Sequence, residues 1–167
     1  MRYEELLARG ADFKRYLQAI LPLLGRRERG HHAQVYIRDL LVEGGRKTPA
    51  AIAKRWPDGN VQALQQLTGQ SPWDSWKVRR AVCELVLQEL TDLQQPVWIV
   101  DDTAFPKKGD HSVGVARQYC GALGKVENCQ SGVFVGYSAP GGYGLVDCRL
   151  YMPEAWFAPE YAARRQK

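Results

Sequence analysis

Apolar residues recur at steps of three and four along the first half of the chain, which is the spacing of one face of a helix. The first series predicts a helix that ends at the basic cluster 26–29, and its apolar positions are Leu6, Leu7, Phe13, Leu17, Ile20, Leu21 and Leu24. A second series, from Ala33 to Leu41, predicts another helix with Gly44 and Gly45 as its C-cap. Later series at 61–67 and 78–93 predict a short and a long helix.

Capping residues indicate where two of these helices begin. Thr48 followed by Pro49 predicts a short helix through Ile52, because threonine caps a helix and proline fits its first turn. The stretch SPWDSWKVRR predicts the start of the long helix, with Ser71 as the N-cap and Asp74 in the position of a capping box. Between these two helices, WPDG at 56–59 predicts a turn.

The pattern changes near Pro96, where β-branched, aromatic and glycine residues replace the helical spacing. Three segments read as strands, namely VWIVDD (97–102), CQSGVFVGYSA (129–139) and YGLVDCRLYM (143–152). The short last turn predicts a three-stranded antiparallel meander, with a polar segment before the second strand and a polar, basic tail after the third. The predicted fold class is therefore α+β, with a helical region over 1–95 and the meander and tail over 96–167.

The composition excludes several classes of protein. No apolar run approaches the ~18 residues of a membrane span, and the acidic residues near the start exclude a signal peptide. We therefore expect a cytoplasmic protein with no membrane partner. The cysteines are widely spaced and form no C-x-x-C pair, which favours buried reduced thiols over a disulfide or a zinc site; they are Cys83, Cys120, Cys129 and Cys148.

The charge is mildly basic and uneven. The net charge is +5, with 15 lysines and arginines against 11 acids in residues 1–95 and 8 against 7 in residues 96–167. A charge of this size is weak support for a nucleic-acid partner, because many soluble proteins are equally basic. Lys77, Arg79 and Arg80 lie in the first half of the predicted long helix, where an external phosphate or simple solvation explains them equally well.

Asp101 and Asp102 follow a core-like apolar run directly. In a regular strand these two side chains point to opposite faces, so one carboxylate can face a site while the other caps the following turn. Carboxylates at a strand end are ligands that Mg²⁺ accepts together with waters and substrate phosphates. The alternative is that both aspartates only initiate a turn by bonding to backbone N–H groups.

The segment WIVDDTAFPKKGDHSVGVARQYCGALGKVENCQSGVFVGYSA closely resembles the first catalytic segment of bacterial insertion-sequence transposases of the DDE-superfamily endonuclease type. IRDLLVEGGRKTPAAIAKR and LQQLTGQSPWDSWKVRR resemble the N-terminal helical region of the same family, so the resemblance covers about residues 10–160. It implies an RNase H-like catalytic fold and an Asp-Asp-Glu triad. In VDDTAF it makes Asp102 the first acid and a metal ligand, with Asp101 as its neighbour.

The resemblance also implies a Mg²⁺ pair as cofactor, double-stranded DNA at transposon ends as partner, and DNA cleavage and strand transfer as activity. Four cations between the first two strands are implied to lie near DNA, with a solvated loop as the alternative; they are Lys107, Lys108, Arg117 and Lys125.

The chain departs from the family pattern in length, because the second Asp and the Glu of the triad lie on later elements in such transposases. The remaining acids, Asp147, Glu154 and Glu160, stand in the wrong context. We therefore expect a truncated transposase that is catalytically incomplete on its own. The alternatives are a non-catalytic DNA-binding regulator or inhibitor of transposition, and an inert remnant. The open sheet edge predicts that the helices cover it, or that the chain forms a homodimer or pairs with full-length transposase.

Overall fold

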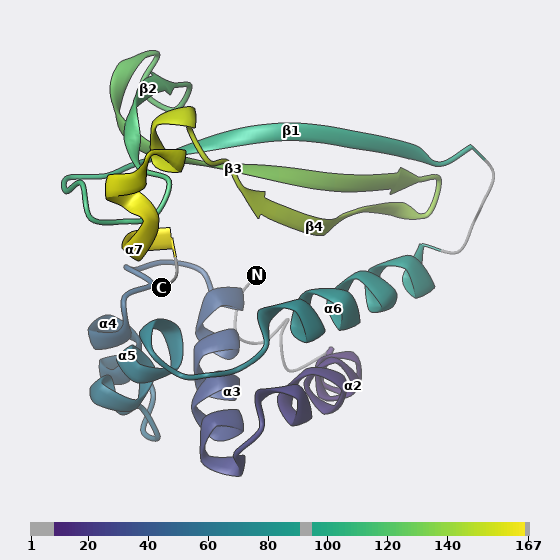
Figure 1. Cartoon of the computed structure of the whole chain (residues 1–167). Helices are drawn as coiled ribbons and strands as arrows, with labels where there is room; N and C mark the ends of the chain where they lie inside the picture. Colours follow the sequence, from purple (N-terminus) through teal and green to yellow (C-terminus); the bar gives the residue numbers. More distant parts are fainter. Residues whose placement is uncertain (1–8, 91–94, 166–167) are drawn as a thin grey trace. The chain divides into compact units, whose positions relative to one another are not determined.

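The computed structural model describes residues 9–90 and 95–165 (Figure 1). The chain divides into two compact units, residues 1–85 and 86–167, and each is described by itself. The helices of the first part are α2 (Gly10–Ile20), the 3₁₀ turn η1 (Leu21–Leu24), α3 (Arg27–Leu41), α4 (Pro49–Arg55), α5 (Val61–Gly69) and α6 (Ser75–Glu89). No helix among the described residues is both long and apolar enough to cross a membrane.

The break between the first two predicted helices lies at Gly25, whose φ of 86° is the left-handed conformation that glycine adopts readily. The basic cluster 26–29 was expected to end the first helix, but Arg27 begins α3 instead, because Gly25 ends the turn before it. Leu6 and Leu7 lie outside the described residues. At the other end, α3 stops at Leu41, before the two glycines that were expected to cap it.

Side-chain caps begin the later helices. The Thr48 hydroxyl accepts a hydrogen bond from the Ala51 N–H at the start of α4, as predicted, and the side-chain Oδ1 of Asn60 accepts one from the Ala63 N–H at the start of α5. The expected capping box at Ser71 is wrong. Asp74 is the residue that caps α6, because its carboxylate accepts hydrogen bonds from the N–H groups of Trp76 and Lys77.

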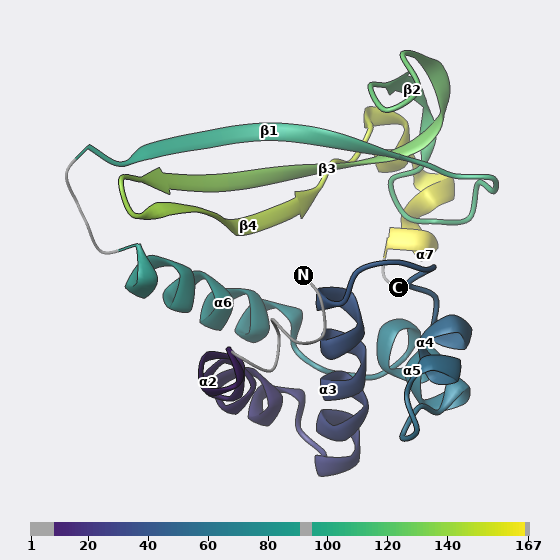
Figure 2. The ribbon, with the colours of Figure 1, turned by 180° about the vertical axis from the view of Figure 1, so that it is seen from behind.

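Two apolar clusters pack α3 against its neighbours. One contains Leu24, Ala33 and Leu67, and the other contains Val35, Ile52 and Leu64. In each cluster, residues of η1, α4 or α5 pack against α3. Helix α3 lies between α2 and the α4–α5 pair in both views (Figures 1 and 2). The helical spacing read from the sequence predicted five of these six core residues and missed Val35, which is 0% exposed. Leu40 and Leu41 were expected on the apolar face of the second helix, but they are 48% and 38% exposed because α3 buries Val35 and Asp39 instead.

The second unit contains an antiparallel sheet. Its strands are β1 (Val97–Pro106), β2 (Ala116–Cys120), β3 (Lys125–Ala139) and β4 (Gly142–Leu150). The long strand β3 pairs with β1 along one side, and with β2 and then β4 along the other. The α+β class and the meander β1–β3–β4 are confirmed, and Figure 2 shows these three strands side by side. The count of three strands is wrong, because β2 forms a short hairpin with the start of β3 inside the segment expected to be irregular.

The residues after β4 fold back instead of forming a polar tail. They form the 3₁₀ turns η2 (Glu154–Phe157) and η3 (Pro159–Tyr161) and the short helix α7 (Ala162–Arg165). Trp156 is 2% exposed, its indole N–H donates to the Val115 carbonyl over 2.7 Å, and its ring contacts that of Tyr161. This buried tryptophan holds the C-terminal turns against the loop that precedes β2.

Candidate functional site

Asp101 and Asp102 lie in the middle of β1, where they pair with Phe134 and Val133 of β3. The regular register places the two carboxylates on opposite faces of the sheet, as predicted. Two expectations are wrong. The strand continues to Pro106 instead of ending at Asp102, and it is exposed instead of buried, with only Ala104 buried among its ten residues. The apolar run VWIV therefore forms an open sheet surface rather than a core strand.

The two carboxylates have different surroundings. The Asp101 carboxylate accepts a hydrogen bond from the N–H of Asp102 over 2.9 Å, so it does not cap a following turn as one interpretation proposed. The Asp102 carboxylate is exposed and receives no hydrogen bond from any described residue. Its oxygens can therefore accept a divalent cation without first breaking an internal contact.

The next carboxylate on the face of Asp102 belongs to Asp147 of β4. Asp147 is the register partner of Val135, one strand beyond β1, so its backbone lies about two strand spacings, ~10 Å, from β1. Its carboxylate is paired with Arg149, at 2.9 Å between the nearest atoms. Carboxylates that share one Mg²⁺ bind it at about 2.1 Å, so Asp147 is too distant and already paired.

Within residues 9–90 and 95–165 no three His, Cys, Asp or Glu side chains are grouped so that they could hold a metal ion. Asp102 fits the chemistry of a hard divalent cation as a single oxygen ligand.

The four cations expected near DNA gather at the end of the sheet where β1 stops. The Lys107 N–H donates to the Asn128 carbonyl over 2.9 Å, and Arg117 is the register partner of Asn128 on the other side of β3. Lys108 is the next residue of the exposed loop. Lys107 lies five residue steps beyond Asp102, which is about 17 Å along an extended strand.

Two of these cations share one acid. Arg117 and Lys125 both lie beside Glu127, at 3.8 and 3.2 Å. The hydrogen bond from the Asn128 N–H, together with Lys125, holds the pKa of Glu127 below its usual value. The charges of Arg117 and Lys125 are therefore partly neutralised by Glu127, whereas Lys108 has no ion-pair partner among the described residues.

Lys77, Arg79 and Arg80 lie on the first turns of α6, in the other unit. Lys77 pairs with Asp74, and Arg80 pairs with Glu84 at 3.0 Å. The guanidinium of Arg79 lies 4.5 Å from the ring centre of Trp76, which is 61% exposed. This arrangement presents an exposed aromatic ring beside three cations, although two of the cations are engaged by helix neighbours.

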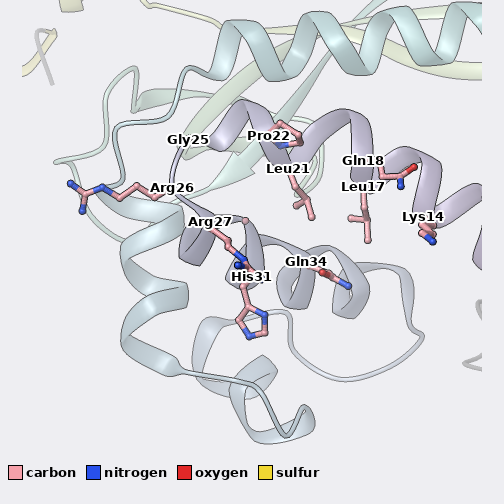
Figure 3. A pocket seen from close by; sticks show the side chains of 11 residues that line it. Lys14, Leu17, Gln18, Leu21, Pro22, Gly25, Arg26, Arg27, His31 and Gln34 are labelled. Atoms are coloured by element: carbon pink, nitrogen blue, oxygen red, sulfur yellow. The ribbon is translucent and has the colours of Figure 1, made fainter.

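A basic groove between α2, η1 and α3 was not predicted as a site. Its volume is about 680 Å³, and Leu17 and Leu21 form an apolar floor. Lys14, Arg27 and His31 stand around it, with Arg27 and His31 next to each other on α3 (Figure 3). The basic cluster was interpreted from the sequence only as the end of a helix. In the structure this cluster forms the start of α3, so Arg27 and His31 line the same groove as Lys14. The spacing of these residues along the chain could not indicate this arrangement.

Comparison with known proteins gives two matches. A family model described as DDE superfamily endonuclease matches residues 19–167. A curated protein of Microchaete diplosiphon, named "Probable transposase for insertion sequence element IS701", is 40% identical over 100 residues, which is 57% of this chain. The match spans about a quarter of that relative's length. No solved structure matches.

Proposed function

The chain belongs to the DDE superfamily endonuclease family, and we propose that it carries the DNA-binding region and the first catalytic strand of an insertion-sequence transposase. The activity in this proposal is metal-dependent DNA cleavage and strand transfer at transposon ends. The main support for it is the family match over residues 19–167, which includes the β1 segment VDDTAF and the helices α3 to α6.

In this proposal Asp102 is a metal ligand. Its exposed carboxylate has no competing hydrogen bond from a described residue, and a hard anionic oxygen is the ligand that Mg²⁺ prefers. When bound, Mg²⁺ would activate the attacking oxygen and stabilise charge on the phosphodiester. Asp101 points to the other sheet face, so its role is to shape β1 through its hydrogen bond to the Asp102 N–H.

The cations at the end of β1 would hold the DNA backbone. Lys107, Lys108, Arg117 and Lys125 gather at one end of the sheet, ~17 Å from Asp102 in the case of Lys107. A DNA strand that reaches Asp102 can therefore place a phosphate a few nucleotides away against these side chains. Lys77, Arg79 and Arg80 would contact phosphates from α6.

A nicking assay tests this proposal. The 167-residue chain with Mg²⁺ and a duplex from the ends of the insertion sequence should give no nicking above background, because a two-metal site needs more acids than Asp102 supplies. The same chain should bind that duplex with an affinity that falls as salt rises. Robust nicking that disappears in Asp102→Ala would contradict catalytic incompleteness. Absence of any DNA binding at low salt would contradict the DNA-binding region.

A second function is supported by the isolation of Asp102 from other acids among the described residues. A chain that binds transposon ends without cutting them would act as a regulator or inhibitor of transposition. Binding to the end duplex that is unchanged by a metal chelator, together with inhibition of an active transposase by the added chain, would favour this function. Inhibition that requires Mg²⁺ and Asp102 would favour the first one.

A further inference from the structure

Helix α5 has one apolar and one polar face. Leu64 and Leu67 are buried against α3, whereas the opposite face carries glutamines at the helical steps of three and four. These glutamines are Gln62, Gln65 and Gln66, and all three are exposed. No hydrogen bond joins their side-chain amides to another described residue. A surface of this kind offers paired donors and acceptors and little charge.

The segment before α5 holds it firmly against α4. The Gly59 N–H donates to the Trp56 carbonyl over 2.9 Å, which closes the turn between the two helices. A Cβ added at Gly59 would lie 2.5 Å from both the Cα and the carbonyl oxygen of Ala53, so the turn touches the backbone of α4. Ile52 of α4 and Leu64 of α5 share one buried cluster with Val35 of α3. The result is two short helices joined by a glycine-containing turn and supported by a third helix.

In a helix-turn-helix, two short helices joined by a turn dock on duplex DNA with the second helix in the major groove. In this chain the second helix is α5, and its outward face is the glutamine face. Glutamine recognises adenine through two hydrogen bonds, one to N6 and one to N7, and each such pair favours the correct base by roughly 5- to 150-fold.

A cation lies next to this face. Arg26, Arg29 and Gln66 line one groove of about 270 Å³ between the start of α3 and α5, and Glu28 lines it as well. Arg29 donates to the carbonyl of Leu24, so its guanidinium is already engaged. Arg26 forms no ion pair with any residue that the structure describes, and it is exposed, so it can meet a phosphate that flanks the groove occupied by α5.

We infer that α5 is a base-reading helix, which presents Gln62, Gln65 and Gln66 to the base edges of duplex DNA while Arg26 holds an adjacent phosphate. The inference rests on the proposed DNA-binding function and extends it from affinity to sequence recognition. The uncharged glutamines would determine which DNA sequence is bound, whereas the cations would supply affinity for DNA of any sequence.

Selection from a duplex library with about 20 random base pairs, two turns of DNA, tests the inference. The wild-type chain should enrich a motif that contains A·T pairs. The triple variant Gln62→Ala, Gln65→Ala, Gln66→Ala should still bind the unselected library with an unchanged salt dependence, but it should enrich no motif. Circular dichroism checks that the variant is folded, and alanine at these exposed positions favours helix. Gln88→Ala removes an exposed glutamine from α6 and is the matched control, which should enrich the wild-type motif.

Arg26→Ala should give the complementary result. It should weaken binding to every sequence and lower the salt slope by about one while leaving the motif unchanged. Enrichment of the wild-type motif by the triple variant would overturn the inference, and so would wild-type binding without any enrichment. If the wild-type chain does not bind the library even at low salt, the proposed DNA-binding function fails as well, so the two failures are distinguishable.

Discussion

Removal of the Asp39 carboxylate should destabilise the helical unit more than any other single carboxylate deletion in it. Asp39 is 1% exposed on α3, and both of its oxygens are used. Arg55 of α4 binds it with two hydrogen bonds, from Nε to Oδ1 at 2.7 Å and from Nη2 to Oδ2 at 2.6 Å. The indole N–H of Trp56 donates over 2.9 Å, and Lys47 Nζ lies 3.4 Å away. One buried acid therefore joins α3 to the segment that leads into α4 and to the turn before α5.

The magnitude follows from what Asp39→Ala leaves behind. Breaking a buried ion pair by removing one partner costs about 3–5 kcal/mol, because the other charge stays buried without compensation. The side chains of Arg55 and Lys47 are 34% and 30% exposed, so they regain some hydration. We therefore expect a loss of roughly 3 kcal/mol in the free energy of unfolding, the lower end of that range.

Urea unfolding followed by far-ultraviolet circular dichroism and tryptophan fluorescence measures this loss. Asp12→Ala is the matched control, because Asp12 forms a surface ion pair with Arg15 at 3.6 Å with both side chains more than 60% exposed. Its cost should be below about 1 kcal/mol. Equal costs for the two variants would refute the claim that the buried network of Asp39 organises the helices.

Three further predictions concern acid stability, the turn before α5 and the exposed sheet. Burial alone would raise the pKa of Asp39, but hydrogen bonds from Arg55 and Trp56 and the nearby cationic charges hold that pKa below its usual value of 3.8. The stability that this acid contributes is therefore present above about pH 4 and falls as the pH drops further. Acid titration of the wild-type chain should show this loss of stability, and the same titration of Asp39→Ala should not. Gly59→Ala should lower the free energy of unfolding in urea by about 1–3 kcal/mol, because its Cβ would overlap the backbone of Ala53. Gly69→Ala is the control and should leave the free energy of unfolding unchanged, because a Cβ added at Gly69 meets nothing within 4 Å. Ile99 is 50% exposed on β1 and lies in an open apolar surface, through which we expect copies of the chain to associate. Ile99→Lys should therefore shift the chain toward monomer in analytical ultracentrifugation. An unchanged distribution of species would exclude this face as the contact between copies.

The sequence predicted those elements whose signal is local. Helical spacing predicted that 33–41 is a helix, although it missed Val35 as a core residue. The pair Thr48–Pro49 marked the start of α4, and alternation around Val133 and Val135 marked β3. In each case the side chains that decide the structure lie within a few residues of one another. Local pattern is therefore sufficient for element type and for much of the core.

Features that depend on distant partners could not be predicted. β2 has five residues and exists because it pairs with β3, so it carries no pattern of its own. Asp39 is a polar residue on an amphipathic helix, and nothing near it in the chain indicates that Arg55 will bind it. The apolar run at the start of β1 indicated a buried strand, yet Val100 is 68% exposed. The residue types of a strand do not indicate which other elements pack against it. The glutamine spacing of α5 was visible in the sequence, but its meaning depends on the turn at Gly59.

Manganese titration is the most direct test of the claim that Asp102 is a ligand for a divalent ion. Mn²⁺ can replace Mg²⁺ at oxygen ligands, and it broadens the amide resonances of nearby residues in a ¹⁵N-labelled chain. If Asp102 binds the ion, the broadening should centre on Asp102 and its partner Val133, remain in Asp101→Asn and disappear in Asp102→Asn. Broadening that is the same in wild type and Asp102→Asn, or that centres on Asp147 instead, would contradict it.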